Sequence, residues 1–256
     1  MKTAQLLTAA ATIVLAGSAS ANVVEVVAAT AHNGGNWPST LGHISDSVNG
    51  NGSNTLGTGD HNPGMVLVDP NDPSTWTNTV NTNSWQHEWL GNGRLDASTS
   101  ANNKIGYFIV DFGSVVAGLE NMYLWGSRYT SPGEDMRNFN VYLADTPSVA
   151  IPAMPNSQAW VGGSQAAADY DFASGGWALL TNNTLNSPSN PYGVDLTIAL
   201  GGASARYVGI EILTAENTDP NDRVGFGQVE FTAIPEPGSL ALLGLGGLLV
   251  ARRRRG

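Results

Sequence analysis

Hydrophobic and polar residues alternate along much of the middle and the last third of this 256-residue chain. The clearest case is the stretch 138–143, where Phe139, Val141 and Leu143 alternate with more polar positions. A period of two places successive side chains on opposite faces of a strand with one buried face. By the same reasoning, further strands are predicted at residues 23–27, 106–113, 119–125, 177–180, 194–200, 206–213 and 224–231.

The strands follow one another with almost no helical pattern between them, and only residues 164–170 resemble a short helix. This order predicts an all-β fold, an antiparallel β-sandwich. Residues 32–73 are rich in Gly and Asn and show almost no periodicity, which predicts a long loop. Loops of this length usually bind a ligand or need an ion to order them.

The start of the chain is apolar without alternation. Lys2 is followed by an apolar run over residues 6–17 and then by Ala19-Ser20-Ala21. A basic start, a short hydrophobic core and a small-x-small end predict a secretory signal peptide, residues 1–21, cleaved after Ala21. We therefore expect residues 22–233 to form the exported domain, whose length suits one β-rich domain.

The end of the chain, residues 234–256, has three ordered parts. The first part, Pro235, Glu236 and Pro237, interrupts regular secondary structure. An uncharged apolar run over 239–251 follows, and then a basic cluster of Arg252, Arg253, Arg254 and Arg255. As a short hydrophobic helix the run spans about 20 Å, less than the ~30 Å hydrocarbon core of a bilayer. The positive-inside rule holds the arginines on the cytoplasmic side. An ordinary short C-terminal anchor is the alternative interpretation.

These three parts resemble the PEP-CTERM sorting signal of Gram-negative bacteria. The resemblance implies transient anchoring in the inner membrane and cleavage near Pro-Glu-Pro by an exosortase. It also implies a final place in the cell envelope, at the cell surface or in the extracellular matrix, often together with exopolysaccharide.

Charge and composition narrow the class of partner. Outside the two end signals the chain keeps six basic and twenty acidic residues, a net charge of about −14. Such a surface repels nucleic acid and anionic membranes and is compatible with cations or neutral sugars. There is no cysteine, so packing, hydrogen bonds or metal ions must stabilise the domain.

Several strand sequences resemble those of discoidin-like domains, also called coagulation-factor C-type or galactose-binding-like domains. The matching pieces are residues 108–113, 119–125, 205–210 and 222–231, together with the Gly-rich loop at 46–52. The resemblance implies an eight-stranded jelly roll of two sheets. The chain departs from the family pattern in having no terminal disulfide, Gln228 where a calcium-binding glutamate is frequent, and Glu230 where an arginine is frequent.

Calcium is a candidate ion for this domain. Asp46, Asn49 and Asn51 supply hard oxygen atoms within one loop, and Gln228 adds an amide oxygen at the family position. The spacing is not that of an EF-hand. Turn formation by Asn and Asp side chains explains the same residues without any metal.

Candidate sugar-binding residues are aromatic or basic. Flat apolar rings stack on the C–H groups of a pyranose, and nearby planar groups donate hydrogen bonds. Trp37, Trp85 and His87 are the ring candidates, and Arg128 and Arg137 flank a turn from which they could hold hydroxyls or carboxylates. Core packing and local ion pairs are the alternatives, and for Trp89 we expect core packing.

Catalytic patterns are weak in this sequence. There is no Gly-x-Ser-x-Gly turn, no cysteine and no zinc-type histidine spacing. The sequence therefore predicts an exported, non-catalytic carbohydrate-binding protein associated with extracellular polysaccharide. A structural or adhesive surface protein that binds other proteins is the first alternative, and a polysaccharide hydrolase or lyase is the second.

Overall fold

The computed structural model describes residues 22–32, 65–67, 76–78, 89–91, 94–126, 135–152, 169–186, 194–216 and 223–234. Their regular structure is almost entirely β, with one 3-10 turn at Ala101–Asn103 and no α-helix among these residues. The strands are β1 (Asn22–Val23), β2 (Ala28–Ala31), β3 (Met65–Leu67), β4 (Trp76–Asn78), β5 (Trp89–Gly91), β6 (Gly106–Trp125), β7 (Asn138–Ala144), β8 (Ala178–Thr184), β9 (Leu196–Ile212), β10 (Val224–Phe226) and β11 (Gln228–Ala233).

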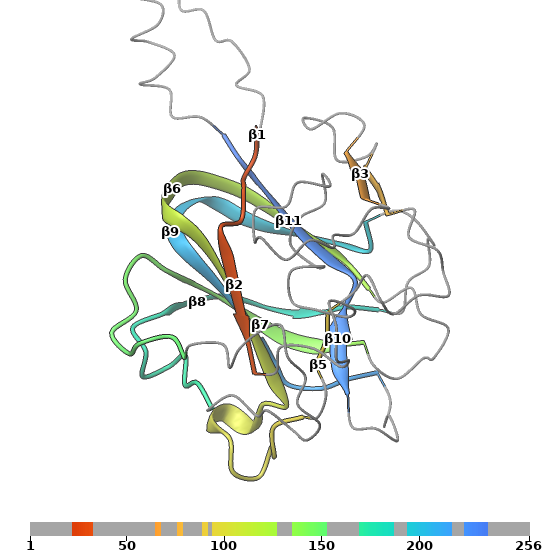
Figure 1. The fold of residues 1–256 in the computed structure, drawn as a ribbon, viewed down its shortest axis with the longest axis vertical. Helices are drawn as coiled ribbons and strands as arrows, with labels where there is room; N and C mark the ends of the chain where they lie inside the picture. The colour runs from red at the N-terminus through yellow and green to blue at the C-terminus, as the bar shows by residue number, and fades with distance from the viewer. Residues whose placement is uncertain are drawn as a thin grey trace, which may run out of the picture.

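One antiparallel sheet makes both layers of the sandwich. Its order is β1-β11-β6-β9-β7-β8, and β2 pairs with the other side of β6. The first half of β6 pairs with the end of β9 and with β2, whereas its second half pairs with the start of β9 and with β11. Both long strands bend together between these halves, so the sheet folds over on itself (Figure 1). The predicted all-β antiparallel sandwich is confirmed.

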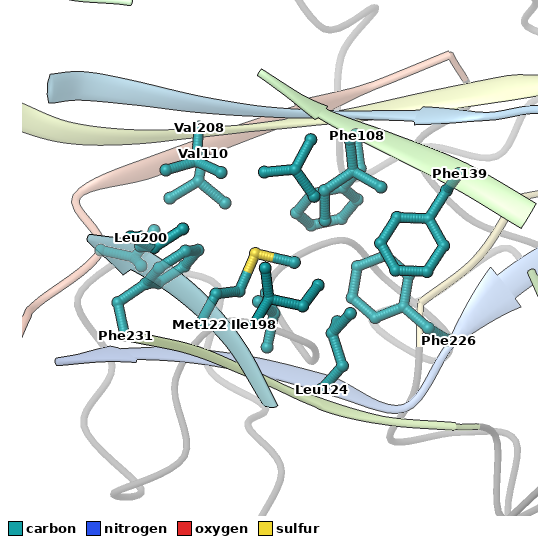
Figure 2. Close-up of a cluster of buried hydrophobic side chains, with 14 of the residues drawn as sticks. Phe108, Val110, Met122, Leu124, Phe139, Ile198, Leu200, Val208, Phe226 and Phe231 are labelled. Carbon is teal, nitrogen blue, oxygen red and sulfur yellow. The ribbon is translucent and has the colours of Figure 1, made fainter. Parts of the chain in front are cut away.

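The main core lies between the two layers. Phe108, Val110, Phe139 and Val208 come from one layer, and Met122, Leu124, Ile198, Leu200 and Phe231 come from the other; all of them are buried. Figure 2 shows these two sets of side chains pointing toward one another, with Phe226 beside them. The alternation read from the sequence is therefore the alternation between the core and the outer faces.

The bend explains how two predicted strands become one. Registers shift in β6 between Asp111 and Asn121, and the chain passes through positive φ at Gly113 and Gly118. Glycine adopts such angles without the clash that a Cβ would cause. A side chain at Gly118 would also collide with the carbonyl oxygen of Ile234.

The predicted strand at 23–27 is only partly correct. Residues 22–23 pair with β11 in one layer, and residues 28–31 pair with β6 in the other. Residues 24–27 cross from one layer to the other, although Val24 and Val27 still donate backbone hydrogen bonds. The run of valines is apolar because it follows the edge of the core, and Val26 is buried there.

The sandwich has two distinct ends. At the bend end lie the turns of β6 and β9 and the end of β11. At the opposite end, called here the loop end, β6, β8 and β9 finish and β7 begins. The connections after β6, β8 and β9 leave from the loop end.

Candidate functional site

Paired amide and hydroxyl side chains lie on the outer face of β7 and β8, at the loop end. Asn138 lies opposite Thr184, and the Thr184 hydroxyl donates to Asn138 Oδ1 at 2.9 Å. Asn140 lies opposite Asn182, whose Nδ2 donates to Asn140 Oδ1. Cross-strand pairs of this kind form because opposite residues of an antiparallel ladder share one face.

The row of polar groups continues across β9 to a buried carboxylate. Glu211 lies opposite Asn140 and is almost fully buried. Its Oε2 accepts hydrogen bonds from Asn102 Nδ2 and Asn140 Nδ2, both at 2.8 Å, and from the Tyr142 hydroxyl at 2.9 Å. Three donors compensate for the burial of a charged group, which would otherwise be strongly unfavourable.

The surroundings of Glu211 change the titration of its tyrosine partner. Burial raises the pKa of Tyr142 to about 12, and the hydrogen bond to Glu211 and the negative charge of that group act in the same direction. The Tyr142 ring also stacks on Phe172, with centroids 4.9 Å apart. The phenol is therefore a fixed donor throughout the physiological pH range.

A turn with unusual backbone geometry presents Asn102 to Glu211. Asn102 and Asn103 both have positive φ, of 59° and 53°. The buried Lys104 holds this turn, because its Nζ donates to the Ala101 carbonyl at 3.0 Å and pairs with Asp169 at 2.7 Å. Asparagine tolerates left-handed angles better than most residues, so this position suits it.

A surface hollow of about 260 Å³ opens beside these strands, and we call it the amide hollow. It is lined by Asn138, Phe139, Asn140, Asn182, Asn183, Thr184 and Leu213. The Nδ2 atom of Asn183 is buried there and has no hydrogen-bond acceptor within the described part of the chain. A buried donor without an acceptor costs stability, and a ligand oxygen can supply what it lacks.

Arg137 is the predicted ligand-binding residue that the structure places at this site. It immediately precedes Asn138, and its backbone carbonyl accepts a hydrogen bond from Leu185 at 2.8 Å. Its side chain is 41% exposed, and its Nη1 atom lies 3.9 Å from a Glu216 carboxylate oxygen. Arg137 thus forms an ion pair with Glu216, which is not one of the neighbouring acids in the preceding turn, and its role in ligand binding stays a prediction.

Gln228, the predicted calcium ligand in the last strand, is fully buried. It lies opposite Trp125 on the outer face of β11, and its side-chain amide nitrogen, Nε2, donates to Glu230 Oε1 at 3.3 Å. Two oxygen-bearing side chains thus share one buried face, which is compatible with a hard cation. The structure does not bring Gln228 to the amide hollow.

The other predicted site residues lie outside the described residues. They are Trp37, Trp85, His87 and Arg128 for sugar, Asp46, Asn49 and Asn51 for calcium, and Pro235, Glu236, Pro237 and Arg252 to Arg255 for sorting. The short helix considered at 164–170 and the hydrophobic helix at 239–251 also fall largely or wholly outside them. Within the described residues no helix is long and apolar enough to span a membrane. Trp89 is buried against Phe108 and Phe226, which confirms the expected core role.

Sequence reasoning missed Glu211 and the amides on β7 and β8. A signal for Glu211 was present, because a lone acid stands between Ile210 and Ile212 in a strand whose neighbours are apolar. The sequence pattern marks Asn138 and Asn140 only as the polar positions that alternate with Phe139 and Val141. Their pairing with β8 depends on the sheet register, which the sequence does not specify.

Comparison with known proteins identifies the sorting signal. Residues 233–255 match the family model described as the PEP-CTERM protein-sorting motif. The resemblance predicted at this end of the chain is confirmed. No curated protein matches the chain.

Solved structures similar to this fold are carbohydrate-binding modules. The family 32 module of Clostridium perfringens NanJ, solved with galactose, has a TM-score of 0.41 at 8% identity and covers 83% of this chain and 98% of its own. A fucose-binding module of Streptococcus pneumoniae has a TM-score of 0.38 at 12% identity, covering 85% and 98%. The lectin domain of Lectinolysin, a His 62 mutant complexed with Lewis b, has a TM-score of 0.39 at 11% identity, covering 83% and 95%. Because these TM-scores are below 0.5, the similarity says nothing about which ligand the present chain binds.

Proposed function

We propose that this protein is an exported carbohydrate-binding protein, whose β-sandwich binds sugar at its loop end while a PEP-CTERM tail directs its sorting. The observation that carries the proposal is the amide hollow. Five Asn and Thr residues line this hollow of about 260 Å³, and one buried amide donor lacks an acceptor within the described part of the chain. Sugar hydroxyls both donate and accept hydrogen bonds, so they complement side chains that do the same.

Neutral sugars are the ligand class that best fits the hollow. All seven residues that line it are uncharged, and the half-buried Leu213 adds apolar surface for C–H groups. The buried Glu211 behind Asn140 holds that amide in one orientation through a 2.8 Å hydrogen bond. Fixed amide orientation favours binding, because little side-chain freedom is then lost when the ligand arrives.

Trp37, Trp85 and His87 would add ring surfaces to the loop end, with Arg128 and Arg137 as polar contacts. Calcium would be held by Asp46, Asn49, Asn51 and Gln228, where its role would be to order the long Gly/Asn-rich loop. The PEP-CTERM tail supports three further proposals: cleavage by an exosortase, transient membrane anchoring in a Gram-negative envelope, and association with exopolysaccharide.

A glycan array tests the proposal. We expect the purified protein to bind a restricted set of neutral glycans, and Asn182→Ala to weaken that binding about three- to tenfold, the value of one hydrogen bond. Thr197→Ala is the control, an exposed strand position on the other layer. An array without any bound glycan, with or without EDTA, contradicts the proposal and favours an adhesive protein, whereas release of new reducing ends from polysaccharide indicates an enzyme.

A further inference from the structure

The sorting tail leaves the domain at one corner of the bend end. β11 ends at Ala233, which pairs with Leu119, and the Ile234 amide donates to the Gly118 carbonyl at 2.9 Å. Asn22 pairs with Ala233, so the segment that precedes the domain reaches the same corner. In Figure 1, β1 and the end of β11 lie together near the bend of β6 and β9, far from β5 and β10.

This corner has no charged residue, in contrast to the acidic domain around it. We define it as the bends 112–119 of β6 and 199–205 of β9, together with Val27 and Ile234. Both bends contain only Gly, Ala, Ser, Val, Leu and Phe. At one border Asp111 is neutralised by Arg206, in a two-bond pair of 2.8 and 2.9 Å. Along the chain, the next acids are Glu25 and Glu120, just outside the corner.

The corner also exposes large apolar side chains. Val27 is 50% exposed, Val115 is 51% exposed and Ile234 is 36% exposed. Val27 lies over Gly113, where its Cγ2 atom is 3.0 Å from the position that a Cβ would occupy, and Ile234 lies at Gly118. The three residues thus follow a single bend. Of the six large apolar side chains that are exposed among the described residues, these three share one uncharged strip, whereas Val149, Leu179 and Leu180 lie outside it.

The length of chain after Ile234 determines how far this corner can be from a membrane. Five residues separate Ile234 from Leu240 at the start of the apolar run. Even fully extended, a segment of that length spans at most about 20 Å. When the apolar run is in a bilayer, the corner is therefore held close to the lipid headgroups.

We propose that this corner is a lipid-contacting surface, on which the domain rests against the membrane while the sorting tail is inserted. The apolar side chains enter the interfacial region, and the lack of charge avoids repulsion between an acidic domain and anionic lipid. The loop end, with the amide hollow, then points away from the membrane. This orientation does not depend on the identity of the sugar.

Because the chain has no cysteine, one introduced cysteine can carry a fluorescent label at a chosen position. We would reconstitute the full chain into vesicles of phosphatidylethanolamine and phosphatidylglycerol, with the label at Ser114→Cys in the corner or at Asn186→Cys at the loop end. Brominated lipid should quench the label at position 114 several-fold more than the label at 186. Adding Val115→Glu to the first protein should reduce that quenching several-fold, with an unchanged circular dichroism spectrum.

Equal quenching by lipid at the two positions overturns the proposal. So does a label at position 114 that aqueous iodide quenches as freely as the label at 186. A third outcome also overturns it. If the label at position 114 becomes protected from iodide only after a membrane extract from an exosortase-containing cell is added, the corner docks a protein and not lipid.

Discussion

At the scale of single residues, Glu211 is the group on which the candidate site depends. Its Oε2 accepts three hydrogen bonds from two segments: Asn102 donates from the 3-10 turn, and Asn140 and Tyr142 donate from β7. The carboxylate thus orients an amide of the hollow and fixes a turn with left-handed backbone angles. Its substitution should affect both stability and ligand binding.

We expect Glu211→Gln to lower the free energy of unfolding by about 1–3 kcal/mol, because an amide offers fewer acceptor sites and adds donors facing other donors. Urea unfolding followed by tryptophan fluorescence measures this change. Glu25→Gln is the matched control, since Glu25 is exposed, and it should change stability by less than about 0.5 kcal/mol. Equal effects of the two substitutions would show that the three hydrogen bonds contribute nothing.

The raised pKa of Tyr142 predicts a loss of stability at alkaline pH. The folded state favours the neutral phenol, so this contribution is complete below about pH 10 and is lost as the pH rises toward 12. Burial also raises the pKa of Tyr107 and Tyr170, which act in the same direction. Unfolding free energies measured across this range should fall less steeply for Tyr142→Phe than for the wild type. An identical slope for the two proteins contradicts the assignment.

At the scale of elements, the sequence predicted the strands better than their connections. The apolar stretches predicted as strands at 106–113, 119–125, 194–200 and 206–213 lie almost wholly in β6 and β9. Burial alternates at the start of β9, whereas residues 106–110, 122–125 and 208–212 are buried on both faces. The same pattern could not show that two predicted strands are one bent strand, since this depends on the pairing of distant segments. For the same reason, the register that brings Asn140 to Asn182 and Glu211 was not predictable.

Substitutions at two glycines test the described geometry of the bend in β6 and β9. Gly118 and Gly201 have nearly equal φ, of 69° and 67°, but only at Gly118 would a Cβ meet another group, the Ile234 carbonyl oxygen. Gly201→Ala should therefore cost about 1–2 kcal/mol of unfolding free energy, for the left-handed angle alone. Gly118→Ala should cost measurably more in the same thermal or urea unfolding experiment. A smaller effect at Gly118 than at Gly201 would mean that β11 does not close against the bend as described.

At the scale of the whole molecule, the sorting tail and the proposed binding site lie at opposite ends of one sandwich. The bend end carries the sorting tail, and the loop end carries the amide hollow with Arg137 at its border. The sorting signal was fully recognisable from sequence, because its three parts are contiguous. Of the predicted binding and metal residues, only Arg137 and Gln228 lie within the described residues, and they lie on different faces. A binding surface assembled from separate strands cannot be recognised from local sequence alone.

The most direct test of this account is to map backbone amide shifts by NMR during titration with the best glycan from the array. The account predicts shifts that saturate with the sugar and concentrate at residues 137–140 and 182–184, with none in the bend at 112–119. Asn182→Ala should require more glycan to reach the same shifts. No shifts with any glycan, or shifts centred on the bend end, would contradict carbohydrate binding at the loop end.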